Sequence, residues 1–192
     1  LLGVSSQLAL ANGNQKGASL SSLITKLTAA DGAAEDSFGI SVAISTDTAV
    51  IGAYMDDDKG GGSGSAYVFE RNQGGTDNWG EIAKLTADDG EVGDEFGISV
   101  AISGDWIVVG AHRGDTPDND RGSAYVFARN QGGANNWGQV TKLIANDAQF
   151  RDFFGNSVAI SNDWIVVGAQ EEDEQGNQSG AAYVFGRNQG GN

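Results

Sequence analysis

The sequence contains no cysteine, one proline and one histidine in 192 residues. The lack of cysteine excludes disulfide bonds and thiolate catalysis. Because His112 is the only histidine, Cys–His catalysis and histidine-based metal sites are excluded as well. No apolar run approaches the ~18 residues of a membrane-spanning helix, so we expect no membrane insertion. Basic residues are few, and the net charge of −15 argues against binding to nucleic acids or anionic membranes.

Glycine, by contrast, is abundant, with 30 residues, which favours many short strands joined by turns. The chain also repeats itself every 58 residues without insertion or deletion, as the spacing of Phe38, Phe96 and Phe154 shows. A fixed period of this length is the signature of a repeat architecture. Each repeat also contains a Lys-Leu pair, a Gly-Ala pair and a Tyr-Val-Phe triplet, which begin at Lys26, Lys84 and Lys142, at Gly52, Gly110 and Gly168, and at Tyr67, Tyr125 and Tyr183.

The period divides the chain into an N-terminal segment, residues 1–25, and three repeats, residues 26–83, 84–141 and 142–192. Residues 1–11 resemble the end of a signal peptide, with an A-x-A-like cleavage site, but we interpret them as part of the fold. We expect residues 1–25 to hold a degenerate strand and the start of an outer strand.

Each repeat contains four strand signals. In the middle repeat they cover Phe96–Ser103, Trp106–His112, Gly122–Arg129 and Trp137–Ala145. The first two are joined by a two-residue turn, and the inner strands carry small and β-branched residues while the outer ones carry aromatic residues. The sequence therefore predicts an all-β fold of β-propeller-type blades, each with four antiparallel strands.

The last repeat lacks its own fourth strand, and the segment Leu20–Ala29 lies one period before a fourth strand. We therefore expect this segment to complete the last blade, within the chain or between chains, because an open sheet edge is a template for another strand. The residues expected to mediate this assembly are Leu20, Leu23, Ile24 and Leu27. Closed propellers need about 4–8 blades. Three interpretations remain, with exchange between chains favoured: a homodimer forming a six-bladed ring, a head-to-tail filament, or a piece of a longer array.

The pairs Phe38-Gly39 and Gly52-Ala53, with their equivalents in the other repeats, resemble FG-GAP repeats, especially those of bacterial surface and secreted proteins. The same repeats build the propeller of integrin α-subunits. The resemblance implies a propeller used for adhesion, recognition or assembly outside the cytoplasm. We expect a non-enzymatic extracellular or cell-surface protein whose partner is itself, another protein or a glycan. The calcium loop of integrin repeats has no counterpart, because Thr46-Asp47 and its equivalents are too short to surround a cation.

Calcium could instead bind the long acidic loops, since it takes six to eight oxygen ligands. The candidate ligands are Asp56, Asp57, Asp58, Asp115, Asp118, Asp120, Glu172 and Asp173. The alternative is that these side chains are simply solvated. A second recurring set, Asp36, Asp94 and Asp152, is expected to cap turns.

Catalysis is not expected, because no nucleophile-elbow motif accompanies His112, which we expect to be exposed. A carbohydrate-binding module is the alternative function, in which tryptophans such as Trp106 and Trp164 stack on sugar rings. The competing interpretation of these tryptophans is packing between blades, the commoner role of the residue.

Overall fold

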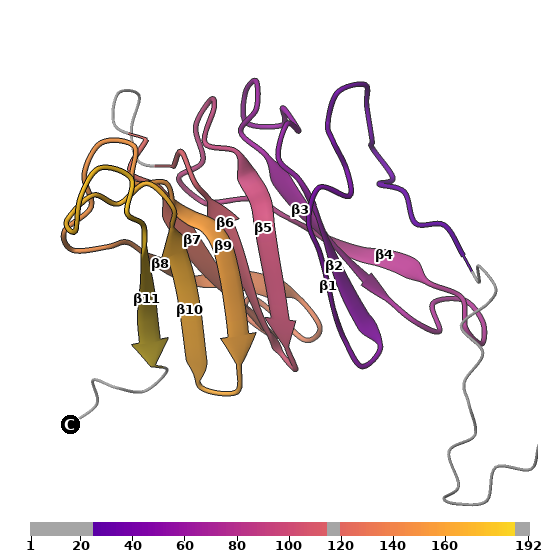
Figure 1. The fold of residues 1–192 in the computed structure, drawn as a ribbon. Coiled ribbons are helices and arrows are strands. Elements are labelled where there is room, and N and C mark those ends of the chain that lie inside the picture. The colour runs from indigo at the N-terminus through magenta and orange to yellow at the C-terminus, as the bar shows by residue number, and fades with distance from the viewer. Residues whose placement is uncertain (1–24, 115–119, 187–192) are drawn as a thin grey trace, which may run out of the picture.

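The computed structural model describes residues 25–114 and 120–186, which form three antiparallel sheets placed side by side in a row (Figure 1). Blade 1 contains β1 (Val42–Ser45), β2 (Thr48–Ala53), β3 (Ser65–Glu70) and β4 (Gly80–Leu85). Blade 2 contains β5 (Phe96–Ser103), β6 (Trp106–Ala111), β7 (Ser123–Arg129) and β8 (Trp137–Leu143). Blade 3 contains β9 (Phe154–Ser161), β10 (Trp164–Ala169) and β11 (Ala181–Gly186). The predicted all-β, blade-type fold is confirmed.

Tight turns join the first two strands of every blade. Thr46, Gly104 and Asn162 occupy these turns with positive φ angles of 55°, 57° and 52°. Each turn leaves two residues between the strands, which excludes the integrin type of calcium loop at this position. Among the described residues there is no helix that could span a membrane.

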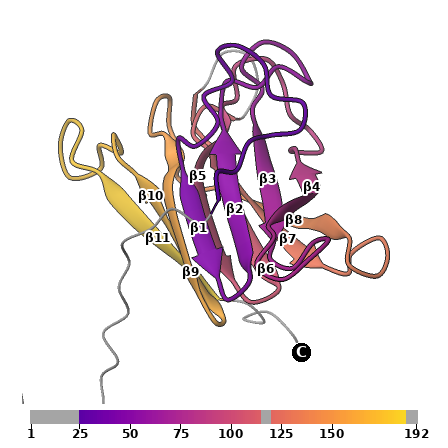
Figure 2. The same ribbon diagram turned by 90° about the vertical axis from the view of Figure 1, so that its right-hand side faces the viewer.

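The two ends of the strands form two different rims (Figures 1 and 2). The linkers that precede β1, β5 and β9 and the long loops that follow β2 and β10 lie on one rim, which we call the loop rim. The two-residue turns lie on the opposite rim. The long acidic segments of the sequence are therefore collected at one side of the molecule.

Adjacent blades pack face to face through apolar side chains. At the joint between blades 1 and 2, Val50 and Val68 share one core with Val100, Ile102 and Phe96. Side chains alternate between the two faces of a strand. We call the face that carries Val50 and Val68 the back face, and the face that carries Val100 and Ile102 the front face. The joint between blades 2 and 3 repeats this arrangement, with the equivalent back-face residues Val108 and Val126.

Backbone contacts fix the two joints in the same way. The Ser41 and Ser99 hydroxyls donate hydrogen bonds of 2.7 Å to the carbonyl oxygens of Gly97 and Gly155 in the next blade. A glycine in the second strand makes room for this approach. A methyl group on Gly52 or Gly110 would lie well under 3.0 Å from the same carbonyl oxygens. The joint is therefore a close backbone contact as well as an apolar one.

Among residues 25–114 and 120–186, no strand pairs with the outer edge of blade 3, whose sheet there consists of β9, β10 and β11. Residues 25–30 lie at the opposite end of the row (Figure 1), so they do not complete this blade within the chain. The strand predicted at Leu20–Ala29 is not formed over its described part, residues 25–29, where the single chain provides no edge to pair with. Leu27 and Ala29 instead pack against blade 1. Leu20, Leu23 and Ile24 lie outside the described residues.

Candidate functional site

A cluster of three carboxylates surrounds Lys84 on the loop rim of blade 1. The Lys84 Nζ atom lies 2.7 Å from Asp31 Oδ2 and 3.0 Å from Asp56 Oδ2, and it also contacts Asp58. The Tyr67 hydroxyl lies 2.9 Å from Asp31 Oδ1 and 2.7 Å from Asp56 Oδ2. β4 supplies the lysine, β3 the tyrosine, and the linker before β1 supplies Asp31. One cation thus holds together segments that are far apart in the sequence.

The charges in this cluster stabilise one another. The hydrogen bond from Lys84 lowers the pKa of Asp31. Burial by itself would raise the pKa of Asp56, but hydrogen bonds from Tyr67 and Lys84 outweigh it, so the pKa of Asp56 is lowered. Burial would likewise lower the pKa of Lys84, yet the hydrogen bonds to the carboxylates raise it. Asp31, Asp56 and Lys84 are therefore charged at neutral pH.

The same carboxylates could hold a metal ion, because ligand atoms of Asp31, Asp56 and Asp58 lie within 4.8 Å of one another. The Lys84 ammonium group contacts all three, so it stands where a bound cation would stand. Asp56 and Asp58 were predicted from the sequence, and Asp31 was not. The signal that could have revealed it is the recurrence of an aspartate at residues 31, 89 and 147, one period apart.

The other predicted ligands do not come together into a second site among the described residues. Asp57 is exposed, and Asp120 lies 4.0 Å from the guanidinium of Arg151. In blade 3, Glu172 is buried whereas Asp173 is exposed. Asp115 and Asp118 lie outside the described residues.

The clusters of blades 2 and 3 are variants of the first. In blade 2, Lys142 Nζ lies 2.8 Å from Asp89 Oδ2, the equivalents of Lys84 and Asp31. In blade 3 the Tyr183 hydroxyl donates a 3.0 Å hydrogen bond to Asp147 Oδ1, and Glu172 takes the position of Asp56. No fourth strand is described in blade 3, so no lysine among the described residues of this blade faces these carboxylates.

Three buried aspartates cap turns, as predicted. Asp36, Asp94 and Asp152 are 7%, 6% and 2% exposed, and each accepts a hydrogen bond from the backbone amide three residues earlier. Burial raises the pKa of Asp94. These residues hold the linkers in shape, which is a structural role.

The prediction that His112 is exposed is wrong. Its imidazole lies 2.7 Å from Glu95 Oε2 and 3.0 Å from Asn156 Oδ1, against the ring of Phe153. The residue lies at the end of β6, where the linkers of blades 2 and 3 close over it. The sequence of one repeat does not show that residues of the neighbouring blade cover this side chain. These contacts join the linker of blade 2 to residues at the start of blade 3.

The two ends of the row expose faces that are buried inside it. On the front face of blade 1, Val42 and Ile44 are 70% and 66% exposed, whereas their equivalents Val100 and Ile102 are 8% and 9% exposed. On the back face of blade 3, Val184 is 63% exposed, whereas its equivalent Val126 in blade 2 is 4% exposed. Phe38 is half-buried, although Phe96 and Phe154 are fully buried.

A hollow of about 310 Å³ lies beside the open edge of blade 3. Its walls include Leu143 of β8, Ile160 of β9 and Phe185 of β11. At the joint between blades 1 and 2, the equivalent residues Leu85, Ile102 and Phe127 belong to one core with Trp137, which comes from the fourth strand of blade 2. The hollow is thus the space that a fourth strand of blade 3 would fill.

Comparison with known proteins agrees with this repeating architecture. The FG-GAP repeat model matches residues 22–69, 79–127 and 137–185, three segments that cover most of the chain. No curated protein matches the sequence. The matched segments contain the Phe-Gly and Gly-Ala pairs that form the joints, so the chain belongs to the FG-GAP repeat family.

Proposed function

We propose that this protein is a non-enzymatic structural or adhesion protein, placed outside the cell or on its surface, that assembles head to tail with copies of itself. The observation that carries the proposal is the exposed front face of blade 1. Its equivalent in blade 2 is covered by the back face of the preceding blade. The back face of blade 3 is free to cover it in a second copy. Apolar surface of this kind is typical of interaction sites.

The two end faces also carry hydrogen-bond donors and acceptors that are equivalent to those paired at the internal joints. Inside the chain, Ser99 Oγ donates to the Gly155 carbonyl, and the Phe154 amide donates to the Arg121 carbonyl. At the ends of the row, the donor equivalent to Ser99 is Ser157 Oγ of blade 3, and the matching acceptor is the Gly39 carbonyl that precedes β1. Likewise, the Phe38 amide corresponds to the Phe154 amide, and its acceptor would be the Ser179 carbonyl. In the described chain these groups lie at opposite ends of the row. A second copy would pair them by repeating the internal joint.

Residues 25–30 support strand completion in the same contact. The Ala30 amide donates a 2.9 Å hydrogen bond to Glu81 Oε2, just as the Asp88 amide donates a 3.0 Å bond to Gln139 Oε1. Leu27 packs on the front of blade 1 as Leu85 packs on the front of blade 2. This segment thus follows the path of the fourth strand of a preceding blade. The open edge of β11 in a second copy would give it a partner by β-addition.

The substitution Gly168→Ala tests the proposal. Gly168 is the equivalent of Gly110, and in the single chain the three atoms nearest to its added methyl group all belong to Ser157, with the side-chain hydroxyl closest. In the assembly the methyl group would meet the Gly39 carbonyl of the next copy. We expect the wild-type chain to sediment as oligomers and the folded variant to sediment as a monomer. A wild-type chain that stays monomeric at high concentration would contradict the proposal, and so would a variant that still assembles.

We further propose that Asp31, Asp56 and Asp58 form a calcium site for which the ion competes with the Lys84 ammonium group. A ligand raises the melting temperature only if it binds to the folded protein, and Lys84 blocks the calcium site in the wild type. We expect the wild-type melting temperature to be the same in calcium chloride and in chelator, and Lys84→Met to melt higher in calcium chloride. Differential scanning fluorimetry measures both. A wild-type protein stabilised by calcium would show that the ion displaces the lysine.

The carbohydrate-binding alternative stays a prediction without a specific observation in its favour. Trp164 is 52% exposed, but its equivalent Trp106 packs in the joint between blades 2 and 3. The exposure of Trp164 therefore follows from the free back face of blade 3. Binding to a glycan array that is lost on Trp164→Ala in the monomeric protein would support the alternative.

A further inference from the structure

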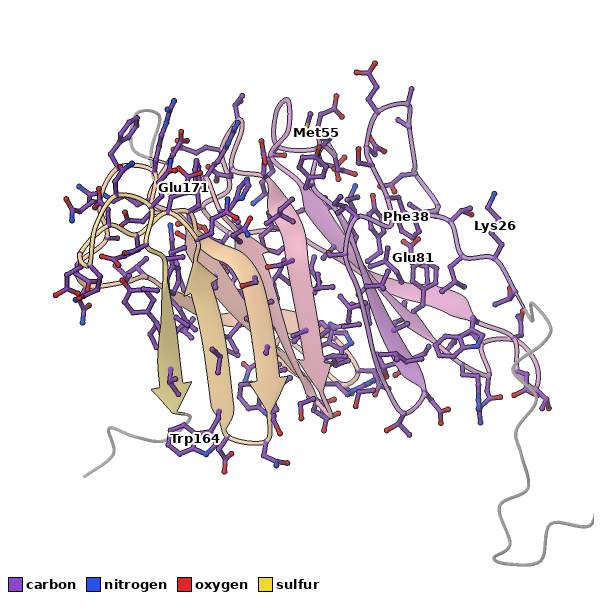
Figure 3. All side chains as sticks on the ribbon, in the orientation of Figure 1. Lys26, Phe38, Met55, Glu81, Trp164 and Glu171 are labelled. Atoms are coloured by element: carbon purple, nitrogen blue, oxygen red, sulfur yellow. The ribbon has the colours of Figure 1, made fainter. Side chains whose placement is uncertain are left out.

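We propose that Lys26 of one copy enters the carboxylate cluster of blade 3 in a second copy, where it pairs with Asp147 and Glu172. The inference rests on the head-to-tail assembly proposed above and names the ion pairs that lock it. Lys26 and the loop that holds Glu172 lie at opposite ends of the row of blades, as the labels Lys26 and Glu171 in Figure 3 show. The contact is therefore one between two copies.

Blade 3 has a site built for a lysine. Tyr183 and Asp147 repeat the contact of Tyr67 with Asp31, at hydrogen-bond distances of 3.0 Å and 2.9 Å. Glu172 is only 5% exposed, and one of its oxygens accepts a 2.7 Å hydrogen bond from the Glu174 amide. In blade 1 the corresponding carboxylates share an ammonium group. Among the described residues, no lysine or arginine forms an ion pair with Asp147 or Glu172.

Lys26 has no carboxylate partner in the part of the chain that the structure describes. It stands one period before Lys84 and two periods before Lys142, in the same Lys-Leu sequence. Both of those residues are partly buried and paired with aspartates. Lys26 is exposed and forms no ion pair with any described residue. Within the described residues, the cation missing from blade 3 and the carboxylates missing around Lys26 thus correspond to equivalent positions in the repeat.

The backbone on the C-terminal side of Lys26 already has the required path. Residues 27–31 make the contacts with blade 1 that residues 85–89 make with blade 2, including the hydrogen bond from the Ala30 amide to Glu81. In blade 1, Lys84 reaches its cluster from this position relative to the joint. Docking blade 3 of a second copy on the front face of blade 1 would therefore bring its cluster to Lys26.

Electrostatics favours this pairing over an equally sized apolar contact. Asp147 and Glu172 are two carboxyl groups on the loop rim of a protein whose net charge is −15. Adding residues 25–31 of a second copy to the edge of blade 3 covers these carboxylates and removes water from them, which is costly unless a cation compensates them. A lysine delivered by the same docking event supplies that compensation. The ion pair thereby selects the blade 3 to blade 1 contact over other apolar encounters.

Charge reversal tests the inference by sedimentation equilibrium. We expect Lys26→Glu to weaken self-association at least ~30-fold, because it places a third anion in a partly buried cluster. Glu172→Lys should weaken it similarly. An equimolar mixture of the two variants should regain association, since each joint would again hold opposite charges. Lys26→Arg should associate like the wild type. The control Arg151→Glu changes the net charge equally at a side chain that is 61% exposed, and it should leave association unchanged.

Two failures are distinguishable in this experiment. If the wild-type chain does not associate, the proposed function is wrong. If it associates and Gly168→Ala blocks association while Lys26→Glu does not, the assembly stands and the ion pair is wrong. Loss of association in both reversed variants without recovery in the mixture would also overturn the pairing of these two residues.

Discussion

Gly110→Ala is expected to lower the free energy of unfolding by at least ~3 kcal/mol, the upper range of overpacking. The methyl group would lie far inside the contact distance of the Gly155 carbonyl oxygen, which is backbone and cannot rotate away. Blades 2 and 3 would have to separate. That would break the Ser99–Gly155 hydrogen bond and open a core that includes the fully buried Phe154.

Thermal unfolding followed by circular dichroism measures this effect, which for a chain of this size corresponds to a decrease of roughly 6–12 °C. Gly168→Ala is the matched control, because the Ser157 hydroxyl in its way can change rotamer. We expect a cost below about 1 kcal/mol for the control in the monomer. Equal destabilisation by both substitutions would mean that the blade joint is not the cause.

Lys84→Met is expected to cost about 3 kcal/mol, because it leaves the buried Asp56 carboxylate without its cation. The Asp56 side chain is 4% exposed and that of Lys84 is 17% exposed, so solvent screens this pair weakly. Lys142→Met is the control in blade 2. Its partner Asp89 is 52% exposed, and glycine replaces the buried aspartate there, so we expect less than about 1 kcal/mol. Urea unfolding gives both values, and equal costs would contradict this assignment.

The effect of Lys84→Met should depend on pH. Because the folded state lowers the pKa values of Asp31 and Asp56, their contribution is present above the unfolded pKa of about 4 and is lost as the pH falls through the folded values. The raised pKa of Lys84 preserves its contribution until the pH rises past about 10.4. The stability difference between wild type and variant should therefore be constant from about pH 5 to 10 and decrease towards pH 2. A difference that grows in acid would contradict the charge pairing.

The fold was largely readable from the sequence because the repeat carries its own markers. The predicted strand Phe96–Ser103 coincides with β5, and the two-residue turns are where the glycine and asparagine residues placed them. The first blade differs. β1 begins at Val42, although the repeat predicts a strand from Phe38. In blades 2 and 3 that first residue is held by a bridge to the preceding blade, through Gly64 and Gly122, and blade 1 has no such neighbour in the described chain.

The candidate site was only partly readable, because its residues come from different repeats. Acidic loops suggested Asp56 and Asp58, but the loop sequence does not show that a lysine from β4 reaches them. Asp31 belongs to the linker and joins the cluster only because the linker crosses the front of blade 1. Sequence spacing inside one loop cannot reveal such contacts. Aligning the three repeats and comparing which lysines and aspartates recur would have revealed them.

The negative charge of the molecule is unevenly distributed between its two rims, and the loop rim carries many of the carboxylates. Its carboxylates include Asp31, Asp56, Asp89, Asp94, Asp147 and Glu172. The opposite rim carries short turns, where Arg71 and Arg129 neutralise Asp47 and Asp105. Copies joined head to tail keep the same rim on the same side, so their negative potential would add across the assembly. Such an assembly would settle on a cationic support with one side down, and image averages would show a single orientation.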